Sequence, residues 1–479
     1  MKSMKLPLAA AASGVMFYLS QGLADVWALA WVAPVPLLWL AYRDTPRWQL
    51  LLASLGAFAA GQIYLVQCYW GRLPFSIIAP MAMGLCAAFA FAVLLSGEAF
   101  RRESHWVALV AFPAFWTALE FAIDHLSPHG TYGALGYAEV SFPAGIQIAA
   151  LFGVHAVSFQ LCLAANAVAL LLARRWAAAG AGLAVCAATL VFGFLRLAAP
   201  AGPRVSVAAL SDVDSRRLEN HTHTLAAARE AADAYAAYIK RLAGVRVFAI
   251  PEGAISTQAS DLRGVLTPLA SAAKAQHALV LTGTFTPAPV QNRAFAFLAD
   301  GAVETYAKRH PLLPFETETP GRKPGLLGTG YATQICKDMD FPGTVRGTAA
   351  HGVRLMIVPA SDFGRDGWIH ARMAIMRGVE NGFAVLRSAF DGLETISDAQ
   401  GRVLARAATN RAGVVAVAAA VPLGPGPTLY TRLGDVFPWL CALLSLLLCA
   451  RMFAGGRAAT VARLLPKPPT TDHSPRTGG

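Results

Sequence analysis

Eight long apolar stretches constrain this chain more than any other feature of its sequence. A helix needs about 20 apolar residues to cross the hydrocarbon core of a membrane. Seven such stretches precede residue 200 and one follows residue 430; they cover residues 6–22, 27–41, 49–71, 75–99, 105–123, 150–173, 176–198 and 434–450. The composition, 56% hydrophobic and 14% charged, is also that of a membrane protein. We therefore predict a multi-span α-helical membrane domain of about eight helices.

Two of these stretches admit other interpretations. The second is short and contains Pro34 and Pro36, so it is the weakest of the predicted spans. The first, in which MKSMK precedes LPLAAAASG, has the charged and apolar regions of a signal peptide. Cleavage there would leave the later topology unchanged, because the next loop would begin outside the cytoplasm in either case.

The basic residues set the predicted orientation. Arginine and lysine are enriched in the cytoplasmic loops of membrane proteins. In this chain they gather at alternate ends of the predicted spans, at Lys2, Lys5, Arg43, Arg47, Arg101, Arg102, Arg174, Arg175, Arg451, Arg457, Arg463 and Lys467. Because seven crossings precede residue 201, the polar segment that follows is expected on the extracytoplasmic face of a bacterial inner membrane. The net charge of +12 therefore reflects membrane edges, and we expect no nucleic-acid partner.

Four regions follow from this pattern. We predict a membrane domain with seven transmembrane helices, an extracytoplasmic domain, an eighth transmembrane helix and a disordered cytoplasmic tail rich in proline and threonine, at residues 1–200, 201–422, 430–455 and 456–479. Within the extracytoplasmic domain, short β-branched runs alternate with helical stretches, which is typical of an α/β or α+β fold. The expected strands are 205–210, 245–250, 278–285, 293–299, 331–336, 353–360, 383–390 and 414–419, and the expected helices are 219–243, 258–275 and 366–381.

Cys336 is the one cysteine of this polar domain, since the other six lie in the apolar stretches. A lone thiol in an oxidising compartment is a liability unless it reacts. Cys336 ends the predicted strand YATQIC and precedes a polar turn, so it could be presented as a nucleophile at the edge of a sheet. A buried structural cysteine is the alternative.

Glu252 and Lys308 share this position at the end of a strand. Glu252 follows VRVFAI and Pro251, and Lys308 follows a strand-like run that ends at Tyr306. Taken singly, each could be a solvated surface residue. Together with Cys336 they provide a base, a fixed cation and a nucleophile, which are the groups that acyl transfer through a thioester needs.

These motifs resemble the carbon-nitrogen hydrolase (nitrilase) superfamily, with PEGAI around Glu252, YAKRHPLLPFE around Lys308 and QICKDMDFP around Cys336. The resemblance implies a four-layer αββα sandwich with a Glu-Lys-Cys triad. With seven spans before this domain and one after it, nearly the whole chain is similar to the apolipoprotein N-acyltransferases. The resemblance then implies a phospholipid acyl donor, a diacylated apolipoprotein acceptor and a thioester on Cys336, within a lipid bilayer. We expect no cofactor, and no metal, because the histidines show no ligand spacing with carboxylates.

The resemblance also implies a role for each residue. Glu252 would be the general base and Cys336 the nucleophile, while Lys308 and the backbone N–H of Lys337 would stabilise the oxyanion. A second glutamate after the lysine is typical, and either Glu316 or Glu318 could fill that place.

The chain departs from the family after the cysteine, where the acyltransferases usually have Tyr-Glu and this sequence has Lys337 and Asp338. A lysine and an aspartate are more typical there of soluble hydrolases. A membrane-tethered amidase is therefore an alternative function, and an inactive envelope scaffold is a third hypothesis.

Overall fold

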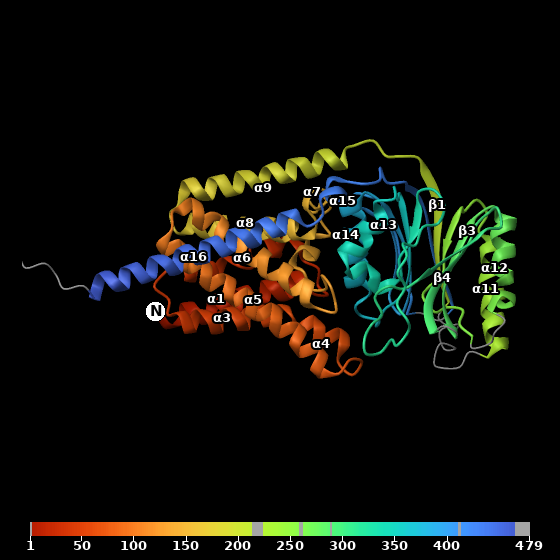
Figure 1. Ribbon diagram of the computed structural model, residues 1–479, viewed down its shortest axis with the longest axis horizontal. Coiled ribbons are helices and arrows are strands. Elements are labelled where there is room, and N and C mark those ends of the chain that lie inside the picture. The colour runs from red at the N-terminus through yellow and green to blue at the C-terminus, as the bar shows by residue number, and fades with distance from the viewer. Residues whose placement is uncertain (1, 213–223, 258–261, 288–289, 411–412, 465–479) are drawn as a thin grey trace, which may run out of the picture.

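The computed structural model describes residues 2–212, 224–257, 262–287, 290–410 and 413–464. A bundle of helices and an α/β sandwich lie end to end along the long axis (Figure 1). The N-terminal bundle, up to Leu197, is helical throughout, and the last helix of the chain returns to pack against it. The sandwich occupies residues 204–422.

The helices of the bundle coincide with the predicted apolar stretches. They are α1 (Lys2–Gln21), η1 (Trp27–Trp31), α2 (Val35–Ala41), α3 (Arg47–Gly61), α4 (Ile63–Tyr69), α5 (Phe75–Arg102), α6 (His105–Leu126), η2 (Leu135–Glu139), α7 (Ala149–Phe152), α8 (Val154–Leu172) and α9 (Trp176–Leu197), joined after the sandwich by α15 (Leu429–Leu433) and α16 (Val436–Leu464). Among the described residues, five segments are long and apolar enough to cross a membrane, at 47–69, 75–102, 105–126, 154–172 and 176–197. Two shorter apolar segments lie at 27–41 and 436–452.

The spans expected at 27–41 and 49–71 are each divided into two elements, and two further boundaries differ from the prediction. The single span expected at 150–173 is broken at Gly153, whose φ of 78° interrupts the helix between α7 and α8. A Cβ atom at Gly153 would lie 2.6 Å from the ring of Tyr430, so close packing of α15 requires glycine there. At the C-terminus, α16 continues to Leu464, so the tail expected to be disordered from residue 456 begins as helix. Residues 465–479 lie outside the described residues.

Two mixed sheets form the centre of the sandwich. The first has the order β11-β1-β2-β3-β4-β5 and the second β10-β9-β8-β7-β6. Their strands are β1 (Arg204–Asp212), β2 (Val247–Ala249), β3 (Leu279–Pro287), β4 (Val290–Phe297), β5 (Val303–Ala307), β6 (Tyr331–Thr333), β7 (Leu355–Ser361), β8 (Ala384–Phe390), β9 (Leu393–Ser397), β10 (Val403–Ala408) and β11 (Val414–Pro422). Fully buried aliphatic side chains such as Val207, Leu281 and Ile357 fill the space between the sheets.

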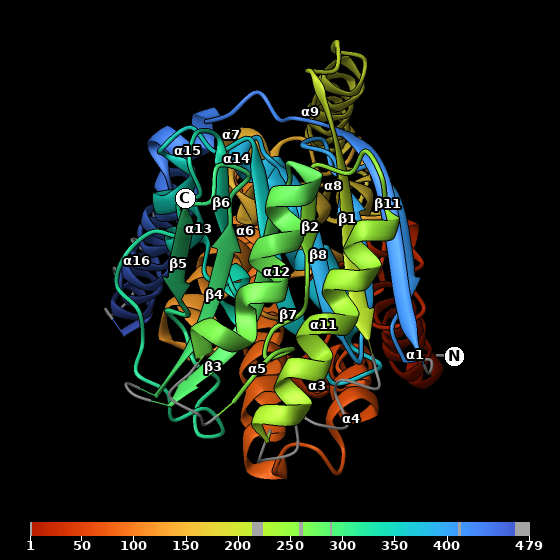
Figure 2. The ribbon, with the colours of Figure 1, turned by 90° about the vertical axis from the view of Figure 1, so that its right-hand side faces the viewer.

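Helices cover both outer faces of the paired sheets. Helices α11 (Leu225–Arg241) and α12 (Leu262–Gln276) pack on the first sheet and lie at the end of the molecule remote from the bundle (Figure 2). Helices α13 (Pro342–Ala349) and α14 (Gly367–Asn381) pack on the second sheet, and α14 contacts α7 and η2 of the bundle. The predicted αββα sandwich is therefore confirmed, with its second helical layer facing the bundle.

The prediction missed α13 and the hairpin of β9 and β10. Four of the six side chains of β10, VLARAA, are exposed, and only Val403 is β-branched, so the sequence carries little of the signal that marks a strand. The expected starts of α11 and α12 fall partly at residues 219–223 and 258–261, which lie outside the described residues.

Candidate active site

The sequence context predicted that Cys336 ends a strand, but in the structure it does not. Strand β6 stops at Thr333, and Cys336 is the first residue of a one-turn 3₁₀ helix, η3 (Cys336–Asp340). Its φ of 44° lies in the left-handed region, which a residue other than glycine adopts only where its surroundings impose it. This sharp turn aims the thiol toward the end of β7, where Sγ lies 3.6 Å from the carbonyl oxygen of Ser361.

Asp338 holds this turn in place. Its Oδ2 accepts hydrogen bonds from the backbone N–H of Ile335 at 3.1 Å and from the hydroxyl of Tyr306 at 2.7 Å. Its Oδ1 accepts from the backbone N–H groups of Arg309 and His310, at 3.0 and 2.8 Å. Asp338 thus ties the cysteine turn to the loop that follows Lys308, and its side chain has a structural position behind the cavity.

The ammonium of Lys308 joins two glutamates. Its Nζ lies 2.8 Å from Oε1 of Glu252 and 2.7 Å from Oε1 of Glu316, and the lysine side chain is 2% exposed. Burial disfavours the charged form, but the two carboxylates outweigh it and raise the pKa of Lys308 well above its usual value. Lys308 is therefore a permanent cation in this site.

Glu252 is fixed at the end of β2 by a second donor. The side-chain amide of Asn292 donates to the same Oε1 at 2.5 Å, from the adjoining strand β4. The other oxygen, Oε2, accepts no hydrogen bond from the residues that the structure describes. One oxygen thus anchors the carboxylate while the other stays available to take a proton.

The thiol of Cys336 is protonated at neutral pH. Burial and the charge of Glu252 raise its pKa well above the usual value, and the charge of Lys308 offsets them only in part. A thiol in this state needs a base to become nucleophilic, and Glu252 is a neighbouring carboxylate that could serve.

A cavity of about 330 Å³ collects the predicted residues. Glu252, Lys308, Glu316, Cys336 and Lys337 line it together, whereas Asp338 lies behind it. Of the two glutamates left open by the sequence, Glu316 contacts the lysine and Glu318 is not part of the lining. Distant sequence positions therefore meet in one cavity.

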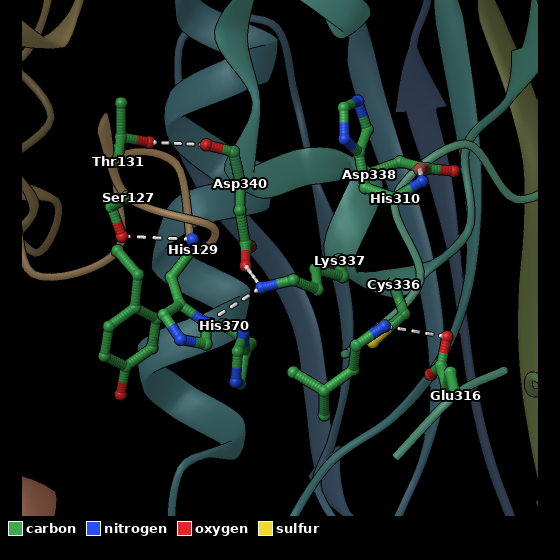
Figure 3. A network of polar contacts seen from close by, with 12 residues as sticks. Ser127, His129, Thr131, His310, Glu316, Cys336, Lys337, Asp338, Asp340 and His370 are labelled. Carbon is green, nitrogen blue, oxygen red and sulfur yellow. Dashed lines mark hydrogen bonds and ion pairs between the residues drawn. The ribbon is translucent and has the colours of Figure 1, made fainter. Parts of the chain in front are cut away.

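Lys337 points away from Glu316 and toward His129 of the helical bundle (Figure 3). Its Nζ lies 3.1 Å from Nδ1 of His129, which belongs to the loop after α6, and 3.7 Å from Oδ2 of Asp340. The same loop is fixed to η3, because the backbone N–H and the hydroxyl of Thr131 both donate to the carbonyl oxygen of Asp340. The bundle thus completes one wall of the cavity.

Sequence reasoning missed several residues of this site. Asn292, His129 and Tyr132 had no motif to mark them, because a single side chain in a strand or loop shows nothing about its spatial neighbours. The pair of Asp362 and Arg387 was partly visible in the run ASDFG. Arg387 donates to both oxygens of Asp362, which lines the cavity beside the thiol.

A second, larger cavity adjoins the first. It measures about 570 Å³ and lies in the bundle between α4, α5, α6 and the loop that follows Lys308. Aliphatic side chains dominate its wall, among them Leu65, Ile77 and Leu85. Met81, His129 and Tyr132 line both cavities, so the apolar space begins where the polar site ends.

Two family descriptions match this chain. Residues 13–168 match "Apolipoprotein N-acyltransferase N-terminal domain" and residues 181–422 match "Carbon-nitrogen hydrolase". An apolipoprotein N-acyltransferase of Geobacter metallireducens is 26% identical, over 93% of this chain and 95% of that protein. One from Azotobacter vinelandii is 27% identical, over 83% of this chain and 86% of that one. Among solved structures, Saccharomyces cerevisiae Nit3 of the nitrilase superfamily is 20% identical, with a TM-score of 0.39 over 47% of this chain and 92% of its own.

Proposed function

Because the chain belongs to the carbon-nitrogen hydrolase family, in its apolipoprotein N-acyltransferase branch, we propose that it moves a fatty acyl chain from a phospholipid to a lipoprotein. The acyl chain would pass through a thioester on Cys336 to the N-terminal amine of a diacylglyceryl-cysteine. The observation that supports this most directly is the union of a buried Glu-Lys-Cys cavity with an apolar cavity in the helical bundle.

In the first half of the reaction, Glu252 takes the proton of the Cys336 thiol as Sγ attacks an ester carbonyl of the phospholipid. The ammonium of Lys308 and the backbone N–H of Lys337 stabilise the oxyanion that forms. The intermediate then expels the glycerol oxygen, which takes the proton from Glu252. A lysophospholipid leaves, and the acyl chain remains on sulfur.

In the second half, the amine of the acceptor attacks the thioester carbonyl. Glu252 now takes a proton from the amine, and the C–S bond breaks as the amide forms. The leaving thiolate recovers its proton from Glu252, which restores the starting state. Glu316 keeps the lysine in position during both halves, since it holds Nζ at 2.7 Å.

The apolar cavity supports a lipid substrate. A fatty chain is bound by burial of its methylene groups, each of which contributes about 0.8 kcal/mol. The aliphatic wall between α5 and α6 offers such burial directly beside the site of chemistry. A small polar amide would have no use for this space, and the relatives that span most of the chain carry the acyltransferase name, so both favour the acyltransferase over an amidase.

We place the sandwich on the periplasmic face of the inner membrane, with residues 1–200 and 430–455 in the bilayer. The clusters of arginine at alternate ends of the helices support this orientation, as at Arg101, Arg102 and Arg174. An active site that adjoins a bundle cavity can receive lipid from the leaflet on that side.

Mass spectrometry of the intact protein tests the proposal. The full-length protein in detergent is incubated with a dipalmitoyl phospholipid, and we expect a palmitoyl adduct that disappears when a diacylated lipopeptide is added. Cys336→Ala should form no adduct, whereas Cys449→Ala, a change to a cysteine of α16, should react normally. Turnover of a small amide without any adduct would instead support the amidase, and neither activity would support an inactive scaffold.

A further inference from the structure

Lys337 is a buried cation whose charge is only partly matched. Its side chain is 8% exposed, and among the described residues its nearest carboxylate oxygen, on Asp340, is 3.7 Å away, too far for a hydrogen bond. Lys308, in the same cavity, has two carboxylates within 2.8 Å. Lys308 is therefore paired with two carboxylates at hydrogen-bond distance, whereas Lys337 has none at that distance among the described residues.

The hydrogen-bond partner of the Lys337 ammonium among the described residues, His129, is uncharged. Burial, together with the charge of Lys337, lowers the pKa of His129 to about 4, so this imidazole is neutral at physiological pH and its Nδ1 accepts from the ammonium. Burial also lowers the pKa of Lys337 itself, more than Asp340 raises it. A second negative charge near Nζ would offset the cost of burying the ammonium, which Asp340 offsets only in part.

The position of the Lys337 ammonium limits which anion could supply this second negative charge. Lys337 and His129 line the catalytic cavity, and His129 also lines the apolar cavity of the bundle. Another basic side chain in the lining, His370, is already paired with Asp366, whose Oδ2 lies 3.2 Å from its Nε2. Among the residues that the structure describes, the Lys337 ammonium has one hydrogen-bond acceptor, so further N–H donors face the place where the polar and apolar spaces meet, one residue from Cys336.

We propose that Lys337, oriented by His129, binds the phosphodiester anion of the phospholipid donor and so makes the enzyme prefer phospholipids over uncharged acylglycerols. A donor phospholipid carries its ester and its phosphodiester on one short glycerol backbone, and successive residues of this chain offer the thiol and the ammonium. An ammonium is a compact point charge that suits a phosphate oxygen. This inference rests on the proposed function and adds the feature by which the donor is recognised.

Two acyl donors that carry the same fatty acyl chains distinguish phosphate binding by Lys337 from a purely structural role. Formation of the Cys336 adduct is timed by intact-protein mass spectrometry with dipalmitoyl phosphatidylethanolamine and with dipalmitoylglycerol, which lacks the phosphate. Lys337→Met keeps the backbone N–H of residue 337 and removes only the ammonium. We expect it to lower kcat/KM for the phospholipid about 10- to 100-fold, mainly through KM, and to lower the value for dipalmitoylglycerol much less. Lys337→Arg should retain most of the preference for the phospholipid.

Comparing both donors on one preparation removes the effect of any misfolded fraction, since it scales both rates equally. Lys274→Met, at an exposed lysine of α12, is the matched control and should leave both rates unchanged. Equal losses with the two donors in Lys337→Met would overturn the inference and leave the proposed function standing. No adduct from either donor in the unmodified protein would overturn the proposed function as well.

Discussion

The Nζ atom of Lys308 lies 2.8 Å from Oε1 of Glu252, and the two side chains are only 2% and 4% exposed. Removing charges from water is costly, and a buried pair is maintained by its mutual attraction and by further hydrogen bonds. Here Glu316 and Asn292 supply those further contacts. The arrangement keeps the ammonium and the carboxylate paired in the cavity that Cys336 also lines.

Lys308→Met should be strongly destabilising, because it leaves Glu252 buried without its counter-charge. Loss of one partner of a buried pair costs about 3–5 kcal/mol. Loss of the oxyanion contact should also lower the rate of Cys336 acylation by at least about 100-fold in the folded fraction. Thermal unfolding in detergent and adduct formation measure the two effects. Lys323→Met, at an exposed lysine, is the control, and unchanged stability in Lys308→Met would contradict the ion pair.

Asp338 should make stability depend on pH. Burial raises its pKa to about 6, against about 4 in an unfolded chain, although its hydrogen bond from Tyr306 and the charge of Lys308 lower it in part. The folded state then holds this proton more tightly, so the contribution of Asp338 to stability grows as the pH falls from about 6 to about 4.

Asp338→Asn removes this titration and some of the acceptor capacity that holds the turn. At neutral pH we expect a loss of about 1–3 kcal/mol, because buried N–H groups lose their acceptor. The deficit relative to the unmodified protein should widen as the pH is lowered toward about 4, which melting curves at several pH values would show. A deficit that narrows on acidification would contradict the raised pKa.

Gly283 sets the position of Glu252. A Cβ atom at this position of β3 would lie 2.5 Å from the Cα of Glu252 and 2.8 Å from the carbonyl oxygen of Pro251. Gly283→Ala must therefore displace Glu252, the proposed base, and a shift of about 1 Å at a reacting group costs about 100-fold in rate. Gly343→Ala, in α13, meets no atom within 4 Å and should leave acylation unchanged while adding about 0.5–1 kcal/mol of stability. Equal rates of Cys336 acylation in Gly283→Ala and Gly343→Ala would contradict the prediction.

Gly84 offers a test of the apolar cavity. It lines that cavity from α5, and a Cβ atom there would meet no atom within 4 Å. Gly84→Phe should fill part of the space, and lost burial of two or more methylene groups corresponds to about tenfold or more in kcat/KM with palmitoyl donors. Octanoyl donors should be affected less.

Gly56→Phe is the matched control for this experiment, because Gly56 is also unobstructed and faces outward on α3. It should leave the dependence on chain length unchanged. The cavity would lose its assigned role if Gly84→Phe slowed both chain lengths equally.

The sequence determined the two-part architecture and the chemical groups of the site. Apolar runs locate the helices, because a helix that faces lipid or other helices must be apolar over most of its length. The αββα sandwich and the three residues Glu252, Lys308 and Cys336 followed from strand patterns and from family motifs. These are local signals, and local signals are readable along a chain.

Only the tertiary structure decided how the site is assembled. The left-handed turn at Cys336 and the contact of Lys337 with His129 are not marked by any local pattern. The choice of Glu316 over Glu318 depends on the path of the loop that follows Lys308. His129 lies 208 positions from Lys337, and no periodicity relates them. Such pairings are fixed by the packing of one fold as a whole, since the energy of each contact depends on neighbours that the chain brings together only when it is complete.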